Sequence, residues 1–356
     1  MTGSATAWVD RFAAALREEH RLLFDYERRA LKPEFAQYVD CPVCGHAEGR
    51  FLFEKDWFVH VRCPRCRVVY MNPRLSNAAT VQFYNSAVNA VYNETKFDVV
   101  SNAPSLDDEI NFSNLDLIVR ERGGVAAGEL LEIGSATGAF LRRAKERGFS
   151  VHGLELNQRN WKRSADLLGP TILNCDVFDA AYPDATFDVL YMRDVIEHIA
   201  EPRRFARELA RIAKPGCLLF VETHNIDSIV NRLTGKRHTV VFGFEHPVHW
   251  SPVSVRRLAA DAGFAVTKIA FASLDCTVFN VVDYLLHPSF TTVYPEPLPP
   301  ALRNALEALG RLVARPRVSR IDRAITPRLA NALRRGSVMK VVAVKRDSLG
   351  NTLLPI

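Results

Sequence analysis

The pattern of apolar positions changes along the chain and is most regular from residue 129 onward. There, short apolar runs alternate with segments in which apolar residues recur at helical spacing. Short runs separated by helical segments predict strands of a parallel sheet in an α/β fold. The predicted strands are 129–134, 150–155, 171–174, 187–193, 217–224, 264–271 and 338–346.

Two stretches lie outside this alternation. Residues 5–31 carry apolar side chains near helical spacing, which predicts one helix that ends before Pro33. Residues 277–336 form an insertion that begins apolar, becomes proline-rich and ends in arginine-rich helical segments. We expect these segments either to cover the core with solvated arginines or to meet an anionic lipid surface or substrate. Their apolar stripe consists of Leu302, Leu306, Leu309, Leu312 and Val313.

The first predicted strand ends in a turn of small residues, from Gly134 to Gly138, and a helical pattern follows directly. A strand, a tight turn and a helix N-terminus present free backbone N–H groups to a polar ligand. The second predicted strand delivers Glu155 at its C-terminal end. An acidic residue at this place accepts hydrogen bonds from two ribose hydroxyls, so the pattern predicts a nucleoside cofactor.

A carboxylate precedes this turn, and the pattern Glu132-x-Gly134-x-Ala136-x-Gly138 resembles motif I of the class I S-adenosylmethionine-dependent methyltransferases. Ala136 stands in place of the usual middle glycine. A dinucleotide-binding fold is the alternative, but it requires Gly-x-Gly-x-x-Gly, a spacing that this turn lacks. The resemblance implies a Rossmann-like, doubly wound, seven-stranded sheet, S-adenosyl-L-methionine as cofactor and Glu155 as its ribose ligand.

The resemblance extends to the turns after the third and fourth predicted strands. Asp176 and Val177 match the family's adenine-binding position, while an Asx turn that caps the next element is the alternative for Asp176. The segment from Phe187 to His198 resembles the family motif that follows strand 4. The implied cofactor-binding residues are Glu132, Gly134, Ser135, Ala136, Gly138, Glu155, Leu156, Asp176, Val177 and Arg193.

Histidines gather after the fifth predicted strand, where such folds bind ligands beyond the carboxyl ends of the strands. Methylation of an alcohol requires loss of its proton, which a neutral imidazole can accept. We therefore predict His249 as a general base and His246 as its alternate or orienting partner. The alternatives are a metal site that includes Glu245, and an ordered loop in which these side chains only satisfy backbone groups.

Seven cysteines include two Cys-x-x-Cys pairs, Cys41 with Cys44 and Cys63 with Cys66. Four thiolates complete a tetrahedral shell for Zn²⁺ and leave no open position, so the spacing predicts a structural zinc site. The intervening residues 51–62 alternate enough to form a hairpin that brings the pairs together. A site that has lost its metal, or a redox pair, is the alternative.

The formal charge of +6 is concentrated in one segment. Residues 301–336 hold nine arginines against Glu307 and Asp322, a balance of +7 that leaves −1 for the rest. This is not a uniformly basic nucleic-acid-binding surface, so nucleic acid is not an expected partner. Since the chain lacks both a long apolar run and a secretory pattern, we expect a cytoplasmic protein. Residues 301–336 are the candidate contact with an anionic membrane surface.

We therefore expect an S-adenosylmethionine-dependent methyltransferase that acts on a hydroxyl or carbon of a sugar, glycan or secondary metabolite. The sugar expectation follows from the cysteine module and the segment around Pro73, which resemble bacterial small-metabolite methyltransferases. A zinc-ribbon RNA methyltransferase and a non-catalytic binding protein are the alternatives, and the oligomeric state is not predicted. The expected domains are an N-terminal helix (1–35), a zinc module (36–75), a helical connector or lid (76–127), a methyltransferase domain (128–346, with the insertion 277–336) and a tail (347–356).

Overall fold

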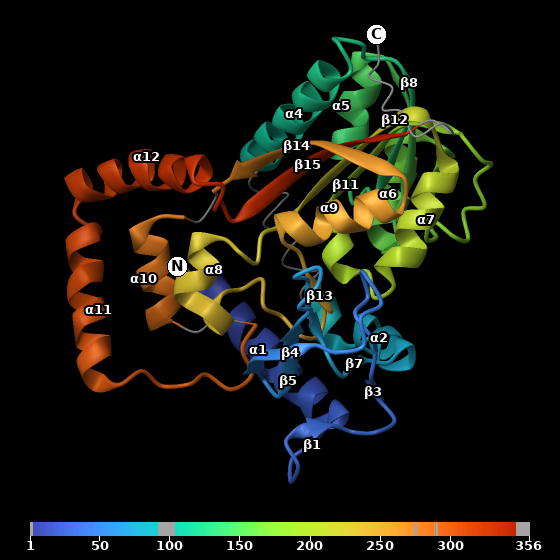
Figure 1. Cartoon of the computed structure of the whole chain (residues 1–356). Helices are drawn as coiled ribbons and strands as arrows, with labels where there is room; N and C mark the ends of the chain where they lie inside the picture. Colours follow the sequence, from blue (N-terminus) through green and yellow to red (C-terminus); the bar gives the residue numbers. More distant parts are fainter. Residues whose placement is uncertain (1–2, 92–103, 274–275, 288, 290, 347–356) are drawn as a thin grey trace. The chain divides into compact units, whose positions relative to one another are not determined.

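A computed structural model describes residues 3–91, 104–273, 276–287, 289 and 291–346 (Figure 1). The chain divides into two compact units, each assembled from segments that are distant in sequence. Residues 92–103 of the predicted connector and the predicted tail lie outside the described residues. The first unit comprises Met1–Val99, His224–Ser251 and Ala270–Met339, and the second comprises Val100–Thr223, Pro252–Ile269 and Lys340–Ile356.

A seven-stranded sheet in the order β10-β9-β8-β11-β12-β15-β14 forms the centre of the second unit. Every neighbouring pair from β10 to β12 is parallel. The seven predicted strands and the doubly wound α/β fold are therefore confirmed. The strands are β8 (Gly128–Ile133), β9 (Phe149–Leu154), β10 (Ile172–Leu173), β11 (Phe187–Arg193), β12 (Ala213–His224), β14 (Phe264–Ala272) and β15 (Val338–Lys345).

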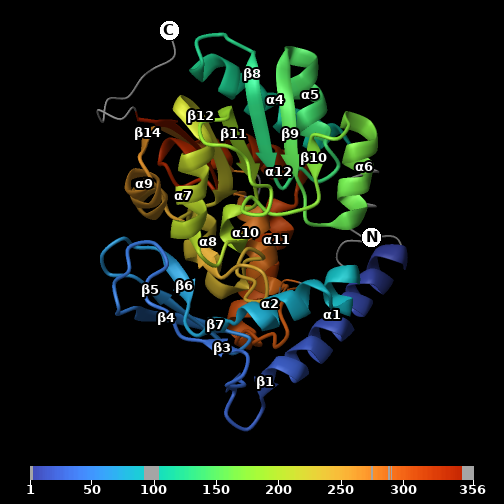
Figure 2. The same cartoon turned by 90° about the vertical axis from the view of Figure 1, so that its right-hand side faces the viewer.

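The sheet lies between two layers of helices (Figure 2). Successive side chains of each strand point to opposite faces, so the two faces of the sheet pack against different layers. On one face Tyr191 stacks on Phe140 of α5, with ring centroids 3.7 Å apart, inside one apolar cluster. On the other face Met192 and Leu219 line a small apolar space together with Leu209 of α7. The helices of this unit are α4 (Pro104–Glu121), α5 (Ala139–Arg147), α6 (Gln158–Leu168), η1 (Ile196–His198), α7 (Pro202–Ile212) and α9 (Pro252–Asp261).

The first unit combines a four-stranded sheet, in the order β13-β6-β5-β4, with two small two-stranded sheets and several helices. Strands β4 and β5 are antiparallel, so the predicted hairpin between the cysteine pairs is confirmed. The strands are β1 (Phe24–Asp25), β2 (Ala30–Leu31), β3 (Ala36–Gln37), β4 (Arg50–Lys55), β5 (Phe58–Arg62), β6 (Val69–Met71), β7 (Arg74–Leu75) and β13 (Val248–His249). The helices are α1 (Gly3–Leu23), α2 (Asn77–Tyr84), α8 (Ile229–Thr234), η2 (Gly235–Arg237), α10 (Val278–Leu286), α11 (Pro300–Val313) and α12 (Pro316–Ala332).

The N-terminal helix is shorter than predicted. It ends at Leu23 instead of residue 31 because β1 and β2 pair as a small antiparallel hairpin. Asp25 Oδ1 closes the turn by accepting the backbone N–H groups of Glu27 and Arg28, at 2.9 and 3.1 Å. Aspartate competes with helix formation in this way, and the apolar periodicity alone did not reveal it.

The predicted insertion forms the helices α10, α11 and α12 (Figure 1). Only two members of its apolar stripe are buried, Leu306 and Val313, whereas Leu302, Leu309 and Leu312 are exposed. The stripe therefore packs on one side only. None of the helices in the described part of the chain combines the length and the apolar content that a bilayer crossing requires.

A buried histidine links α1 to the β4–β5 turn in the first unit. His20 is fully buried and stacks on Phe24, and its Nε2 lies 3.1 Å from the carbonyl oxygen of Asp56. Because that oxygen can only accept, Nε2 carries the hydrogen, and Nδ1 of the neutral ring accepts from the Tyr26 hydroxyl at 3.2 Å. Burial disfavours the imidazolium and lowers the pKa of His20 to about 4.

This burial predicts acid sensitivity. Below its ordinary pKa of about 6.5, His20 takes up a proton in the unfolded chain but not in the folded one. The free energy of unfolding should therefore fall as the pH drops from about 6.5 towards 4, by at most about 1.4 kcal/mol per pH unit from this residue. Urea unfolding of wild type and His20→Gln across this range measures the difference.

His20→Gln should have a shallower pH dependence of the free energy of unfolding than wild type. Equal slopes in wild type and His20→Gln would contradict the assignment.

Candidate functional site

The turn between β8 and α5 lies where the strand order reverses. Strand β8 pairs with β9 on one side and with β11 on the other, so the crossovers diverge at its carboxyl end. Open α/β sheets bind ligands at this switch point. Gly134, Ala136 and Gly138 all have positive φ, at 75°, 44° and 78°. A Cβ at Gly134 would come within 2.7 Å of a methyl of Val195, so a side chain there would clash as well as strain the backbone.

Glu155 lies against this turn, as predicted from its place after β9. Its Oε2 accepts the backbone N–H of Ala136 at 2.8 Å, and its Oε1 accepts that of Asn157 at 2.7 Å. The turn itself is anchored to β9, because the N–H groups of Gly134 and Ser135 both donate to the Leu154 carbonyl, at 2.8 and 2.9 Å. The structure therefore brings the carboxylate and the small-residue turn into direct contact.

Two features of this region fit a nucleoside ligand. The hydroxyl of Ser135 is buried and has no hydrogen-bond partner among the described residues. Leu156, next to Glu155, is 72% exposed and presents apolar surface beside a polar turn. A ligand that combines a polar ribose with an apolar base would engage both kinds of surface.

The other residues predicted to bind the cofactor differ in their burial and in their hydrogen bonds. Asp176 Oδ1 accepts the backbone N–H groups of Phe178 and Asp179, at 2.8 and 2.9 Å, so the alternative of a capping Asx turn is present. Val177 and Glu132 are buried, with exposed fractions of 2% and 6%. Arg193 donates to Asn111 of α4 at 3.0 Å and is held at the end of β11.

A buried polar network at the ends of β11 and β12 was not predicted. The side-chain amide of Asn114 donates to Glu222 at 2.8 Å and to the Tyr191 hydroxyl at 3.0 Å. Burial raises the pKa of Glu222, although Lys340 lies 3.7 Å away and partly offsets the effect. The only sequence signal was a glutamate inside the otherwise apolar run that forms β12, since Asn114 resembles any polar helix position.

The predicted catalytic histidines belong to the first unit. His249 is fully buried, and its Nδ1 lies 3.1 Å from Nε2 of His224. Burial, reinforced by the neighbouring histidines, lowers the pKa of His249 well below its usual value, so the ring is neutral and weakly basic. His246 is half-buried, and its Nδ1 donates to the Val240 carbonyl at 2.8 Å, which leaves Nε2 as the unprotonated nitrogen of the neutral ring.

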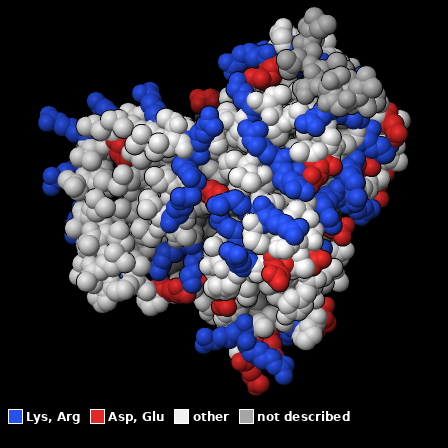
Figure 3. All heavy atoms as spheres, viewed as in Figure 1, with Lys and Arg blue, Asp and Glu red and all other residues white. Residues whose placement is uncertain are grey.

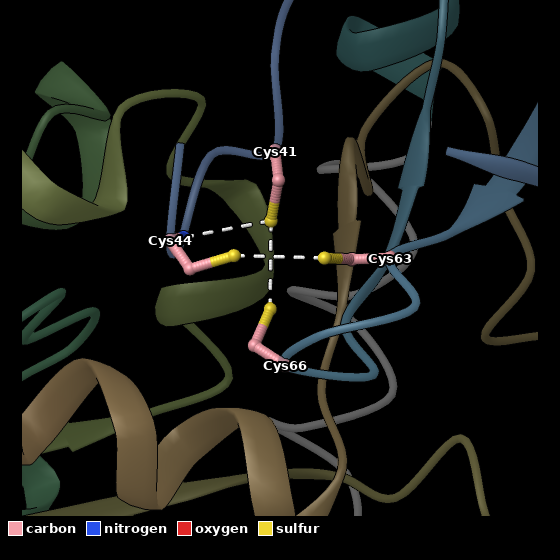
Figure 4. Close-up of side chains that lie close together, drawn as sticks. All are labelled: Cys41, Cys44, Cys63 and Cys66. Carbon is pink, nitrogen blue, oxygen red and sulfur yellow. Dashed lines mark hydrogen bonds between the residues drawn. The ribbon is translucent and has the colours of Figure 1, made fainter. Parts of the chain in front are cut away.

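The four predicted metal-ligating cysteines converge (Figure 4). Their sulfurs all lie within 4.8 Å of one another, with Cys41 to Cys66 at 3.4 Å and Cys44 to Cys63 at 3.5 Å. A tetrahedral ion with bonds of about 2.3 Å separates its sulfurs by about 3.8 Å, so the spacing fits such an ion. All seven cysteines are free of disulfides.

Two similar turns produce this convergence. In each one the first cysteine donates its N–H to the carbonyl five residues later and accepts from the N–H four residues later. Gly45 and Arg67 occupy the same place in the two turns, with φ of 71° and 63°. The repeated geometry aims both pairs of thiols at one point.

The match to a known protein family covers mainly the second unit. Residues 108–269 match the family described as a methyltransferase domain. The chain is 33% identical over 101 residues to 2-methyl-6-phytyl-1,4-hydroquinone methyltransferase of Synechocystis sp., covering 27% of this chain and 32% of that protein. It is 30% identical over 134 residues to the ubiquinone biosynthesis O-methyltransferase of Caulobacter vibrioides, covering 35% and 49%. The chain thus spans about a third of the length of the first of these curated relatives and about half of the second.

Solved structures of similar proteins are more distant in sequence. A SAM-dependent methyltransferase from Archaeoglobus fulgidus is 16% identical with a TM-score of 0.43, covering 67% of this chain and 94% of that one. A SAM-dependent methyltransferase from Thermotoga maritima, described as a possible histamine N-methyltransferase, is 18% identical with a TM-score of 0.41, covering 66% and 89%. The fold assignment rests instead on the family match and the strand order. Residues 108–269 therefore resemble a methyltransferase domain, and the second unit has the strand order of a Rossmann-like α/β sheet.

Proposed function

We propose that this protein transfers a methyl group from S-adenosylmethionine to a hydroxyl of a small molecule. The observation that carries the proposal is the contact between Glu155 and the turn at Ala136, 2.8 Å from carboxylate to N–H. This contact places a ribose acceptor directly against the small-residue turn at the switch point of the sheet. The match of residues 108–269 to the methyltransferase domain family supports it.

The cofactor-binding roles follow from the surfaces described above. Glu155 accepts hydrogen bonds from the ribose hydroxyls, and Leu156 covers one face of the adenine. Asp176 Oδ1 already accepts N–H groups of its own turn, so Oδ2 is the oxygen that accepts from the adenine amino group. The bound cofactor supplies a methyl group already activated by a sulfonium, so the chain's own residues mainly position the acceptor and remove its proton.

A hydroxyl acceptor is favoured by the names of the relatives, one of which is an O-methyltransferase of ubiquinone biosynthesis. The sugar and glycan acceptors expected from the sequence have no counterpart in those names. The matched family region ends at residue 269, and most of the first unit lies outside it. The acceptor that carries the hydroxyl is therefore either a hydroquinone-like ring or a sugar, and the acceptor assay below distinguishes the two.

For the general base, we propose a different order of preference between His246 and His249 from the one expected from the sequence. A general base must reach the acceptor proton and must have a useful pKa. His249 is fully buried with a strongly lowered pKa, whereas His246 is half-buried and donates through Nδ1, so Nε2 is the acceptor nitrogen of its neutral ring. We propose His246 as the base and His249 as part of the packing that orients it through His224.

We also propose that Cys41, Cys44, Cys63 and Cys66 bind one structural Zn²⁺. Three of the four cysteines are buried, and together the four thiols supply a complete soft donor set. With four protein ligands no position remains for a substrate, so the ion would hold the two turns together instead of acting in catalysis.

The acceptor assay tests the function. Purified protein is incubated with S-adenosylmethionine and either a catechol or hydroquinone series or a nucleotide-sugar series, and products are identified by mass spectrometry. We expect a methyl ether from one series. His246→Ala should lower kcat by about 10²–10⁴-fold, with His287→Ala unchanged. A carbon- or nitrogen-methylated product, or a normal rate in His246→Ala, would contradict the proposal.

Glu155→Ala tests the cofactor site. Loss of hydrogen bonds to a charged group should weaken S-adenosylmethionine binding by about 1.5–3 kcal/mol, roughly ten- to a hundredfold in Kd. Isothermal titration calorimetry measures the change. Glu146→Ala, on an exposed part of α5, is the matched control and should bind as wild type. An unchanged Kd in folded Glu155→Ala would rule out the ribose assignment.

Metal analysis tests the zinc site. Protein purified without chelator should contain one zinc per chain, and Cys63→Ser should lose it together with thermal stability. Cys217→Ser removes a buried thiol outside the cluster and should retain the metal. Metal-free wild type with four freely titratable thiols would refute the site.

A further inference from the structure

Helices α11 and α12 carry apolar side chains that the structure leaves in solvent. We use the name α11–α12 surface for the set of exposed apolar residues and arginines on these two helices. Each apolar member is between 38% and 58% exposed. These members are Leu302, Leu309, Leu312, Ile321, Ile325, Leu329 and Leu333.

On α12 the exposed apolar side chains form one stripe. Ile321, Ile325, Leu329 and Leu333 are four residues apart, and side chains at this spacing lie one above the other on a helix. The side of this helix next to the stripe supplies the packing contacts, since Ala330 belongs to a buried cluster of the first unit. The helix is thus packed on one side and apolar on a neighbouring, solvent-facing side.

The exposed charged side chains of α12 are all positive. The one acidic residue, Asp322, is buried and accepts the backbone N–H groups of Val278 and Phe279 at the start of α10, at 3.0 and 3.1 Å. Its charge is therefore engaged inside the unit. The exposed arginines of this helix, none of which has an ion-pair partner among the described residues, are Arg317, Arg320, Arg323 and Arg328.

Helix α11 also carries exposed apolar side chains, with fewer charged residues than α12. Arg311 lies 4.0 Å from Glu307, a loose pair that leaves both side chains largely exposed. Figure 3 shows a largely uncharged face over α10 and α11, with Lys and Arg side chains along the edge formed by α12. Apolar area bordered by positive charge suits a partner that is apolar inside and anionic at its surface.

A second copy of the chain fits this surface less well. A two-fold contact would bring the same arginines of both copies together, and like charges repel in a desolvated interface. An anionic bilayer offers the opposite charge to every one of them, and their long side chains can extend to the headgroups while the apolar stripe enters the acyl boundary.

We propose that the α11–α12 surface docks on an anionic lipid bilayer, with both helices lying in the headgroup region. This proposal concerns where the protein acts and does not rest on the identity of the methyl acceptor or on methyl transfer. The docking is peripheral, combining apolar burial with attraction to anionic lipids, so it should weaken at high salt.

The experiment is flotation of the full-length protein with vesicles. Vesicles of equal parts phosphatidylglycerol and phosphatidylcholine should retain it, and phosphatidylcholine alone should not. Arg317→Gln with Arg320→Gln should lower partitioning by roughly 25-fold, at about fivefold per arginine. Ile325→Asp with Leu329→Asp should lower it at least as much, because it both removes apolar contact and adds negative charge.

Two control variants test whether a loss of vesicle binding is specific to the α11–α12 surface. Arg203→Gln with Arg207→Gln alters two exposed arginines of α7, and Leu167→Asp alters an exposed leucine of α6 that is 52% accessible. Both should partition like wild type. Absence of binding to anionic vesicles, or equal loss in the control variants, would overturn the proposal. So would sedimentation showing a dimer that Ile325→Asp with Leu329→Asp dissociates, because the surface would then be an interface between copies.

Discussion

The hydrogen bond between the Ala136 N–H and the Glu155 carboxylate holds the candidate cofactor site of the second unit together. It joins the turn after β8 to the end of β9, and two further N–H groups of the same turn bond to the Leu154 carbonyl. The turn needs three residues at positive φ, one of them an alanine. Such a conformation is maintained only where the surroundings determine it, and here the neighbouring strand does so.

The two units contain different features. The second unit contains the sheet, the turn and most of the region that matches the methyltransferase family. The first unit contains the cysteine cluster, the buried histidines and the exposed arginine-rich helices. The fold alone therefore does not identify an acceptor, and most of the first unit lies outside the matched region.

The parts that the sequence predicted well are those in which local chemistry dictates local structure. Short apolar runs identified all seven strands, glycine spacing identified the turn, and cysteine spacing identified the cluster. The length of the first helix was wrong because one aspartate closed a turn that periodicity cannot show. The Asn114–Glu222 network could not be found, because its partners are 108 residues apart and meet only after folding. Burial of His249 likewise depends on packing between distant segments.

The most direct test of the central claim is calorimetric titration of the wild-type protein with S-adenosylmethionine, S-adenosylhomocysteine and a nicotinamide dinucleotide. If the turn at Ala136 and the carboxylate of Glu155 form a nucleoside site of the methyltransferase kind, one equivalent of S-adenosylmethionine binds, S-adenosylhomocysteine displaces it, and the dinucleotide gives no heat. Binding of the dinucleotide alone, or of none of the three, would contradict the account.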